Sequence, residues 1–156
     1  KKLAIIATKG TLDWGYPPFI LASTAAALGY ETEIFFTFYG LQLLKKDLKL
    51  EVSPLGNPGM PMPMGMDKWF PVLGTALPGM QALMTSMMKK KMASKGVASL
   101  EELRELSQEA DVKLIACQMT VDLFEMDTSE FIDGVEYAGA ARFFEFAGES
   151  DICLYI

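Results

Sequence analysis

The sequence contains no histidine among its 156 residues, and this absence excludes several kinds of active site. Many hydrolases with serine or cysteine nucleophiles use histidine as the general base, and many zinc sites use its imidazole as a ligand. Cysteine is also scarce, because Cys117 and Cys153 are the only two. They are too few for a disulfide framework or a four-thiolate zinc site. Any chemistry must therefore use a thiol, carboxylate, hydroxyl or amine, or a cofactor bound from outside.

Basic residues are in the minority, with 14 Lys and Arg against 20 Asp and Glu. The net charge of −6 argues against nucleic-acid binding. Residues 1–100 carry 11 basic and 6 acidic side chains (+5), whereas residues 101–156 carry 3 and 14 (−11). Such a dipolar chain can guide self-association or docking with a charged partner, although acids that merely solvate helix faces explain it as well. The apolar run before Lys9 is too short for a secretory signal, so we expect a cytoplasmic protein.

Apolar runs alternate with helical patterns along the chain. Residues 3–8 form a continuous apolar run, which is typical of a strand buried on both faces of a parallel sheet. The remaining strands are predicted at 31–38, 112–117, 134–136 and 152–156, and the helices at 17–28, 40–49, 99–110, 119–126 and 137–146. Ser99 and Glu102 have the spacing of a capping box. The pattern predicts one α/β domain over 1–156, with a parallel sheet of four or five strands, helices on both faces and a long helical insert at about 53–95.

Cys117 is the strongest candidate for a reactive group. It ends a predicted strand and directly precedes a short helix, where free N–H groups and the helix dipole stabilise a thiolate. The residues around it do not fit a phosphatase loop, a thioredoxin pair or a peroxiredoxin site, because positions 114, 120 and 123 hold Leu, Thr and Leu. A lone thiol at a pocket mouth remains, suited to carrying sulfane sulfur or forming a mixed disulfide. The alternative is a buried structural cysteine, which is also how we interpret Cys153 in the last strand.

Ligands of open α/β sheets bind at the carboxyl ends of the strands, so the residues there are predicted to complete the site. Six positions are candidates: Lys9, Gly10, Thr37, Tyr39, Gly40 and Thr120. Thr120 is expected to donate a hydrogen bond to the sulfur and Lys9 to help electrostatically, while the other four shape the pocket mouth. The first of these loops lacks both nucleotide-binding glycine signatures, which leaves a flavin site as a weaker alternative.

Nine of the eleven methionines lie between positions 60 and 92. Met60, Met62, Met64 and Met66 alternate, and thioethers at such spacing can bind Cu(I), but the prolines between them favour adaptable packing or a partner surface. Residues 69–88 carry no charge and precede three lysines. For this segment we favour an interface between subunits, then contact with a membrane surface through 69–91, and last a transmembrane span.

Three segments occur in an order and spacing that identify a family. They are 34–41 (IFFTFYGL), 114–119 (LIACQM) and 132–139 (IDGVEYAG), followed by the closing apolar strand. With them the chain resembles the DsrE/DsrF-like sulfur-relay family, in its larger branch with a methionine-rich insert. The resemblance implies a flavodoxin-like three-layer sandwich, a homo-oligomer, and a persulfide carried on Cys117. It also implies TusA-like carriers or rhodanese-like donors as partners.

The sequence thus predicts a sulfur carrier, or a sulfurtransferase, that relays sulfane sulfur on one cysteine. Neither a cofactor nor a metal is predicted for this function. The alternatives are a non-catalytic oligomeric scaffold or membrane-peripheral module, and a flavodoxin-type binder of small molecules.

Overall fold

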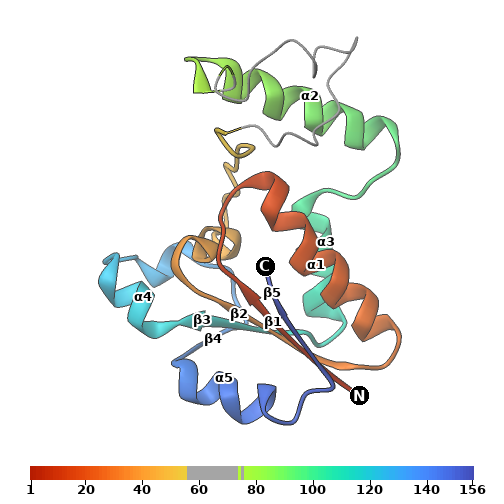
Figure 1. Ribbon diagram of the computed structural model, residues 1–156, viewed down its shortest axis with the longest axis vertical. Helices are drawn as coiled ribbons and strands as arrows, with labels where there is room; N and C mark the ends of the chain where they lie inside the picture. Colours follow the sequence, from red (N-terminus) through yellow and green to blue (C-terminus); the bar gives the residue numbers. More distant parts are fainter. Residues whose placement is uncertain (56–73, 75) are drawn as a thin grey trace.

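The computed structural model describes residues 1–55, 74 and 76–156, which form a five-stranded parallel sheet with helices on both faces (Figure 1). The strand order is β4-β3-β2-β1-β5, and each neighbouring pair is parallel. The strands are β1 (Lys2–Ala7), β2 (Glu31–Phe36), β3 (Lys113–Cys117), β4 (Val135–Ala138) and β5 (Ile152–Tyr155). The helices are α1 (Leu12–Ala27), η1 (Phe38–Leu44), α2 (Met80–Ser94), α3 (Leu100–Glu109), α4 (Gln118–Leu123), η4 (Thr128–Glu130) and α5 (Ala140–Ala147). The predicted α/β class and parallel sheet are confirmed.

The sheet separates two apolar cores. Helices α1 and α3 pack together over one face, and α5 covers the other (Figure 1). Along β1, Leu3 and Ile5 belong to the larger core under α1 and α3, whereas Ala4 packs in the smaller core with Phe143 of α5. Because its successive side chains enter different cores, β1 is apolar throughout rather than alternating.

Helix α1 begins earlier than predicted. It starts at Leu12, so Pro17 and Pro18 lie inside the helix rather than in its first turn. The two prolines remove N–H groups that would bond carbonyls four residues earlier. The helix persists because Leu12, Tyr16 and Phe19 are buried in the larger core. Tertiary packing outweighs the local cost of the prolines here.

Two further boundaries differ from the prediction at the edge of the site. The 134–136 strand extends to Ala138, and its pairing with β3 places Tyr137 in the strand, so α5 begins at Ala140. The predicted helix over 40–49 is instead the 3₁₀ helix η1, which begins at Phe38 directly after β2.

Arg104 of α3, which is buried, donates hydrogen bonds to the carbonyls of Leu43 (2.8 Å) and Lys45 (2.7 Å). These bonds pair carbonyl groups at the end of η1 and fix it against α3.

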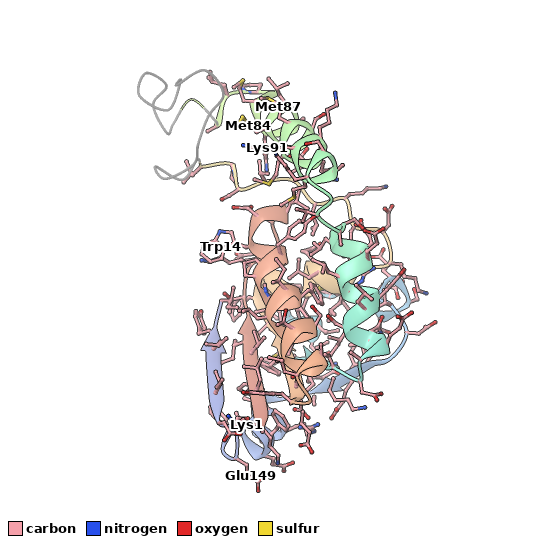
Figure 2. The ribbon with its side chains drawn as sticks, turned by 90° about the vertical axis from the view of Figure 1, so that its right-hand side faces the viewer. Lys1, Trp14, Met84, Met87, Lys91 and Glu149 are labelled. Carbon is pink, nitrogen blue, oxygen red and sulfur yellow. The ribbon has the colours of Figure 1, made fainter. Side chains whose placement is uncertain are left out.

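Helix α2 lies within the predicted insert. It is placed beyond the N-terminal start of α1, away from the sheet (Figure 1), with Met84 buried and Met87 37% exposed (Figure 2). Thr85 accepts a hydrogen bond from the backbone N–H of Val52 (2.9 Å) and so ties α2 to the preceding chain. The alternating methionines at 60–66 lie outside the described residues, as do positions 69–73 and 75 of the uncharged 69–88 segment. None of the helices described here combines the length and apolarity needed to cross a membrane.

Candidate functional site

The sheet topology places Cys117 at the carboxyl end of β3, beside the end of the edge strand β4. The connection from β3 to β4 runs on the side of α1 and α3, since Val121 and Phe131 belong to the larger core. The next connection, from β4 to β5, runs through α5 on the opposite face. In open α/β sheets ligands bind outside the carboxyl ends of the strands, and Cys117 stands at such an end. Cys117 and Ala138 are partners in register at these two strand ends.

The cysteine side chain lies beneath the surface. Cys117 is 4% exposed and packs in the smaller core with Phe35, Ile115 and Phe143. As predicted, it stands at the start of a helix, because it is the N-cap residue of α4. The thiol is thus at the end of the sheet, as the sequence indicated, but covered by α5 rather than open at a pocket mouth.

Hydrogen bonds favour the ionised form of this thiol. Burial alone raises the pKa of Cys117, but hydrogen bonds from four groups outweigh it and leave the pKa below the ordinary thiol value. The donors are the hydroxyl and backbone N–H of Thr120, the hydroxyl of Thr37 and the backbone N–H of Met119. Each bond is stronger to a thiolate than to a neutral thiol, which is the physical cause of the lowered pKa. Three of these four donors lie in the first turn of α4, and the fourth, Thr37, directly follows β2.

The two threonines form one polar unit. Their hydroxyl oxygens are 3.2 Å apart, and the backbone N–H of Phe38 donates to the Thr120 hydroxyl at 3.3 Å. Because the Thr120 oxygen accepts from Phe38, its hydroxyl proton is free to be donated to the sulfur or to Thr37. The structure thus brings Thr37 and Thr120 to Cys117, from the segments that follow two neighbouring strands.

The other predicted residues serve the site less directly. The Lys9 ammonium lies 3.1 Å from the centroid of the Trp14 ring, a cation–π contact, rather than beside the sulfur. A side chain on Gly40 would collide with the carbonyl oxygen of Ala7, and one on Gly10 with the carbonyl oxygen of Tyr39. Both glycines therefore allow the segment after β1 and the segment after β2 to lie in close contact with each other.

An exposed aromatic surface next to Cys117 was missed at the sequence level. Tyr39 stacks on Phe124 with ring centroids 5.9 Å apart, and Phe38 meets Phe124 edge-on at 6.1 Å. Phe38 has a positive φ of 50°, which is unusual for a side chain of this size. With two aliphatic neighbours, these residues make up what we call the aromatic surface: Phe38, Tyr39, Met119, Leu123 and Phe124. Only the fold brings positions 38–39 and 124 together, so no local sequence signal could have found it.

A charge cluster fastens α5 over the cysteine. Arg142 of α5 donates two hydrogen bonds of 3.0 Å to the carboxylate of Glu33, and one of 2.9 Å to Glu136. Glu33 is buried on β2, and Glu136 lies on β4. Hydrogen bonding to Glu33 is the main reason that the pKa of Arg142 is raised. The helix that carries Phe143 is therefore held to two strands by one guanidinium.

The prediction that Cys153 is a core residue is wrong. Its side chain is exposed. The reason is its position on β5, which is the last strand of the sheet and has a neighbour on one side only.

The described residues contain no group of three or more acidic, cysteine or histidine side chains placed to hold a metal ion.

Comparison with known proteins shows similarity over the whole chain. The sequence model of the DsrE/DsrF/DrsH-like family matches residues 1–155. The chain is 85% identical over 156 residues to the sulfur carrier protein DsrE2 of Allochromatium vinosum, covering 100% of this chain and 98% of that protein. It is 33% identical over 162 residues to the uncharacterized protein YrkE of Bacillus subtilis, covering 100% and 97%. Among solved structures, the ychN protein from E. coli has a TM-score of 0.55 at 13% identity, with 100% of this chain and 99% of that chain covered, which is a likeness of fold.

Proposed function

Because the chain belongs to the DsrE/DsrF/DrsH-like family, we propose that it is a sulfur carrier that holds sulfane sulfur as a persulfide on Cys117. The observation that carries this proposal is the thiol at the end of β3, whose pKa is lowered by hydrogen bonds from Thr120, Thr37 and Met119. The 85% identical relative is named a sulfur carrier protein, which supports the same role here.

The transfer step follows from thiolate chemistry. The Cys117 thiolate attacks the outer sulfur of a donor persulfide, R–S–SH, forming a new S–S bond while the donor's S–S bond breaks. The products are Cys117–S–SH and the donor thiolate, R–S⁻, so no external oxidant or reductant is consumed. The reverse reaction with an acceptor thiolate releases the sulfur and regenerates the Cys117 thiolate. The hydrogen bonds from the strand ends stabilise the anion before loading and after release.

The partners in this proposal are other proteins with reactive thiols. TusA-like carriers and rhodanese-like donors are the exchange partners that we propose, together with a homo-oligomer as the working assembly. Since Cys117 is 4% exposed, the exchange also requires α5 or the loops beside it to move aside.

Mass spectrometry of the intact protein tests the proposal. After incubation with glutathione persulfide and removal of excess reagent, we expect a gain of about 32 Da, one sulfur atom, that maps to the peptide containing Cys117. The Cys117→Ser protein should gain nothing at this position. Cys153→Ser is the matched control, because it removes the exposed cysteine and leaves the site untouched. Loading of Cys153 alone, or of neither cysteine, would rule the proposal out.

A further inference from the structure

The aromatic surface has no role in the carrier chemistry described so far. Its five side chains are between 40% and 65% exposed. Singly exposed apolar residues are common on proteins, but three of these five, Phe38, Tyr39 and Phe124, are in mutual ring contact. Exposed aromatic clusters of this kind are typical of the centres of protein interfaces.

The surface is linked to the sulfur through the backbone. Phe38 donates its N–H to the Thr120 hydroxyl, and the N–H of Met119 is itself one of the donors to Cys117. The surface therefore begins one or two residues from the groups that hold the thiol. A molecule bound on it lies beside Cys117.

The chain segment that contains α4 is acidic. Between positions 114 and 141 the sequence has six acidic residues and no basic one. Glu130 is paired with Lys45 and Glu136 with Arg142, so their charges are compensated. Asp122 and Glu125, which flank Leu123 and Phe124 in the sequence, form no ion pair in the part of the chain described here.

From these observations we propose that the aromatic surface docks the cysteine-bearing segment of a partner protein, a segment with apolar residues in its centre and basic residues at its flanks. The apolar residues cover Phe38, Tyr39 and Phe124, and the basic residues face Asp122 and Glu125. This inference rests on the proposed function, because the docked segment is the one that would bring the partner's sulfur atom to Cys117.

A second copy of this chain fits the surface less well as the sulfur partner. Its remaining cysteine, Cys153, follows Asp151, which forms no ion pair in the described part of the chain, whereas the nearby Glu149 is paired with Lys2. Presenting the segment around Cys153 to Asp122 and Glu125 would bring like charges together, which disfavours association. The basic helix α2 of a second copy, with Lys89–Lys91, has the complementary charge but carries no cysteine.

Peptide binding tests the inference without using the cysteine chemistry. Two short fluorescein-labelled peptides with serine in place of cysteine share a Leu-Ser-Phe centre and differ in having lysines or glutamates at the flanks. Fluorescence anisotropy should show the lysine peptide binding about tenfold more tightly at low salt, with the preference falling as salt is added.

Two variants locate the binding site. D122N/E125Q should weaken binding of the lysine peptide about fivefold without changing apolar contacts. F124A should weaken both peptides about tenfold. The matched controls are E105Q/E109Q on the exposed side of α3 and Y155A on β5, which should leave binding unchanged.

Equal binding of the two peptides, or unchanged binding to D122N/E125Q, would overturn the inference. So would a finding that D122N/E125Q weakens self-association in sedimentation while peptide binding stays the same, because the surface would then belong to a second copy. The peptides contain no thiol, so this result is independent of persulfide loading. A protein that binds the lysine peptide but never gains sulfur on Cys117 would contradict the proposed function and leave the docking surface standing.

Discussion

At the scale of single residues, Cys117 combines two properties that usually oppose each other. A buried thiol normally stays protonated, because burial disfavours the charged form. Here the strand ends supply hydroxyl and amide donors that converge on the sulfur. Hydrogen bonds to a charged group contribute about 1.5–3 kcal/mol each, so a few of them outweigh the desolvation of one sulfur atom. The protein thereby favours the ionised form of a thiol that is covered.

Replacing Thr120 tests this balance. Thr120→Val keeps the shape of the side chain and removes the hydroxyl that bonds both the sulfur and the N–H of Phe38. We expect the pKa of Cys117 to rise, because the thiolate loses a donor, so the pH midpoint of alkylation by iodoacetamide should move to higher pH. A Cys153→Ser background leaves Cys117 as the only thiol that reacts.

The midpoint, and not the absolute rate, is the informative quantity in this experiment. The rate also depends on how often the sulfur is uncovered, whereas the midpoint follows the fraction of thiolate. Thr128→Val is a suitable control, because it places the same change on η4, outside the hydrogen bonds to the sulfur. An unchanged midpoint for Thr120→Val would show that the hydroxyl does not hold the thiolate.

At the scale of elements, α5 is the cover of the site. It has eight residues, and its Phe143 stacks on Phe35 of β2 with ring centroids 5.1 Å apart. So short a helix buries little apolar surface, so the ion pairs of Arg142 contribute a larger part of the free energy that holds α5 against the sheet. Their partner Glu33 is buried, so removing the guanidinium would leave an uncompensated carboxylate under the helix.

Arg142→Gln should therefore loosen the cover. We expect the free energy of unfolding to fall by about 2 kcal/mol. The loss is smaller than for a fully buried ion pair, because the Arg142 side chain is partly exposed to water. Cys117 should also react faster with a bulky thiol reagent such as DTNB, and hydrogen exchange of α5 should accelerate. The double variant E33Q/R142Q removes both charges, so it should recover part of the lost stability. A single variant with wild-type DTNB kinetics would show that α5 does not limit access to the sulfur.

Several elements could be predicted because their signals are local. The apolar run of β1 and the Ser99–Glu102 capping box, whose two bonds measure 2.6 and 3.1 Å, depend on neighbouring residues only. The start of α1 was placed too late because prolines normally end or begin a helix, whereas here buried side chains on both sides of Pro17 keep the helix intact. The length of β4 depends on its pairing with β3, which periodicity does not report.

The same distinction holds for the site. Cys117, Thr37 and Thr120 could be found because each stands at a predicted strand end, and parallel strands bring those ends together. Phe124 and Arg142 follow no strand end, and they reach the site through the path of the chain after β3 and β4. The exposure of Cys153 depends on which strand lies at the edge of the sheet, which the order of strands along the chain does not determine.

At the scale of the whole molecule, the structure shows where the acidic and the basic parts of the sequence lie. The acidic residues 101–156 supply β3, β4 and β5, and so both edges of the sheet as well as the strand that ends in Cys117. The lysines of residues 89–91 lie on α2, away from the sheet (Figure 1; Lys91 in Figure 2). In the proposed docking, a partner that reaches Cys117 approaches the acidic part of the molecule, where long-range attraction favours basic partners before contact is made.

The ionised thiol also couples the chemistry of the site to the stability of the whole fold. The pKa of Cys117 is lower in the folded protein than the ordinary thiol value of 9.0, so between these two values the unfolded chain binds a proton that the folded chain has released. The free energy of unfolding must then rise with pH across this window. The stabilisation is complete above pH 9.0 and is lost as pH falls through the folded-state pKa.

Denaturant unfolding at a series of pH values measures this coupling. In a Cys153→Ser background under reducing conditions, the protein with Cys117 is compared with Cys117→Ser, so that the contributions of all other titrating groups cancel. The difference in free energy of unfolding should grow with pH by at most about 1.4 kcal/mol per pH unit, and level off above the ordinary thiol pKa. A difference that declines with pH would mean that burial dominates and that the resting state is the neutral thiol. Sulfur transfer would then need a base from the partner, because a neutral thiol does not attack a persulfide at a useful rate.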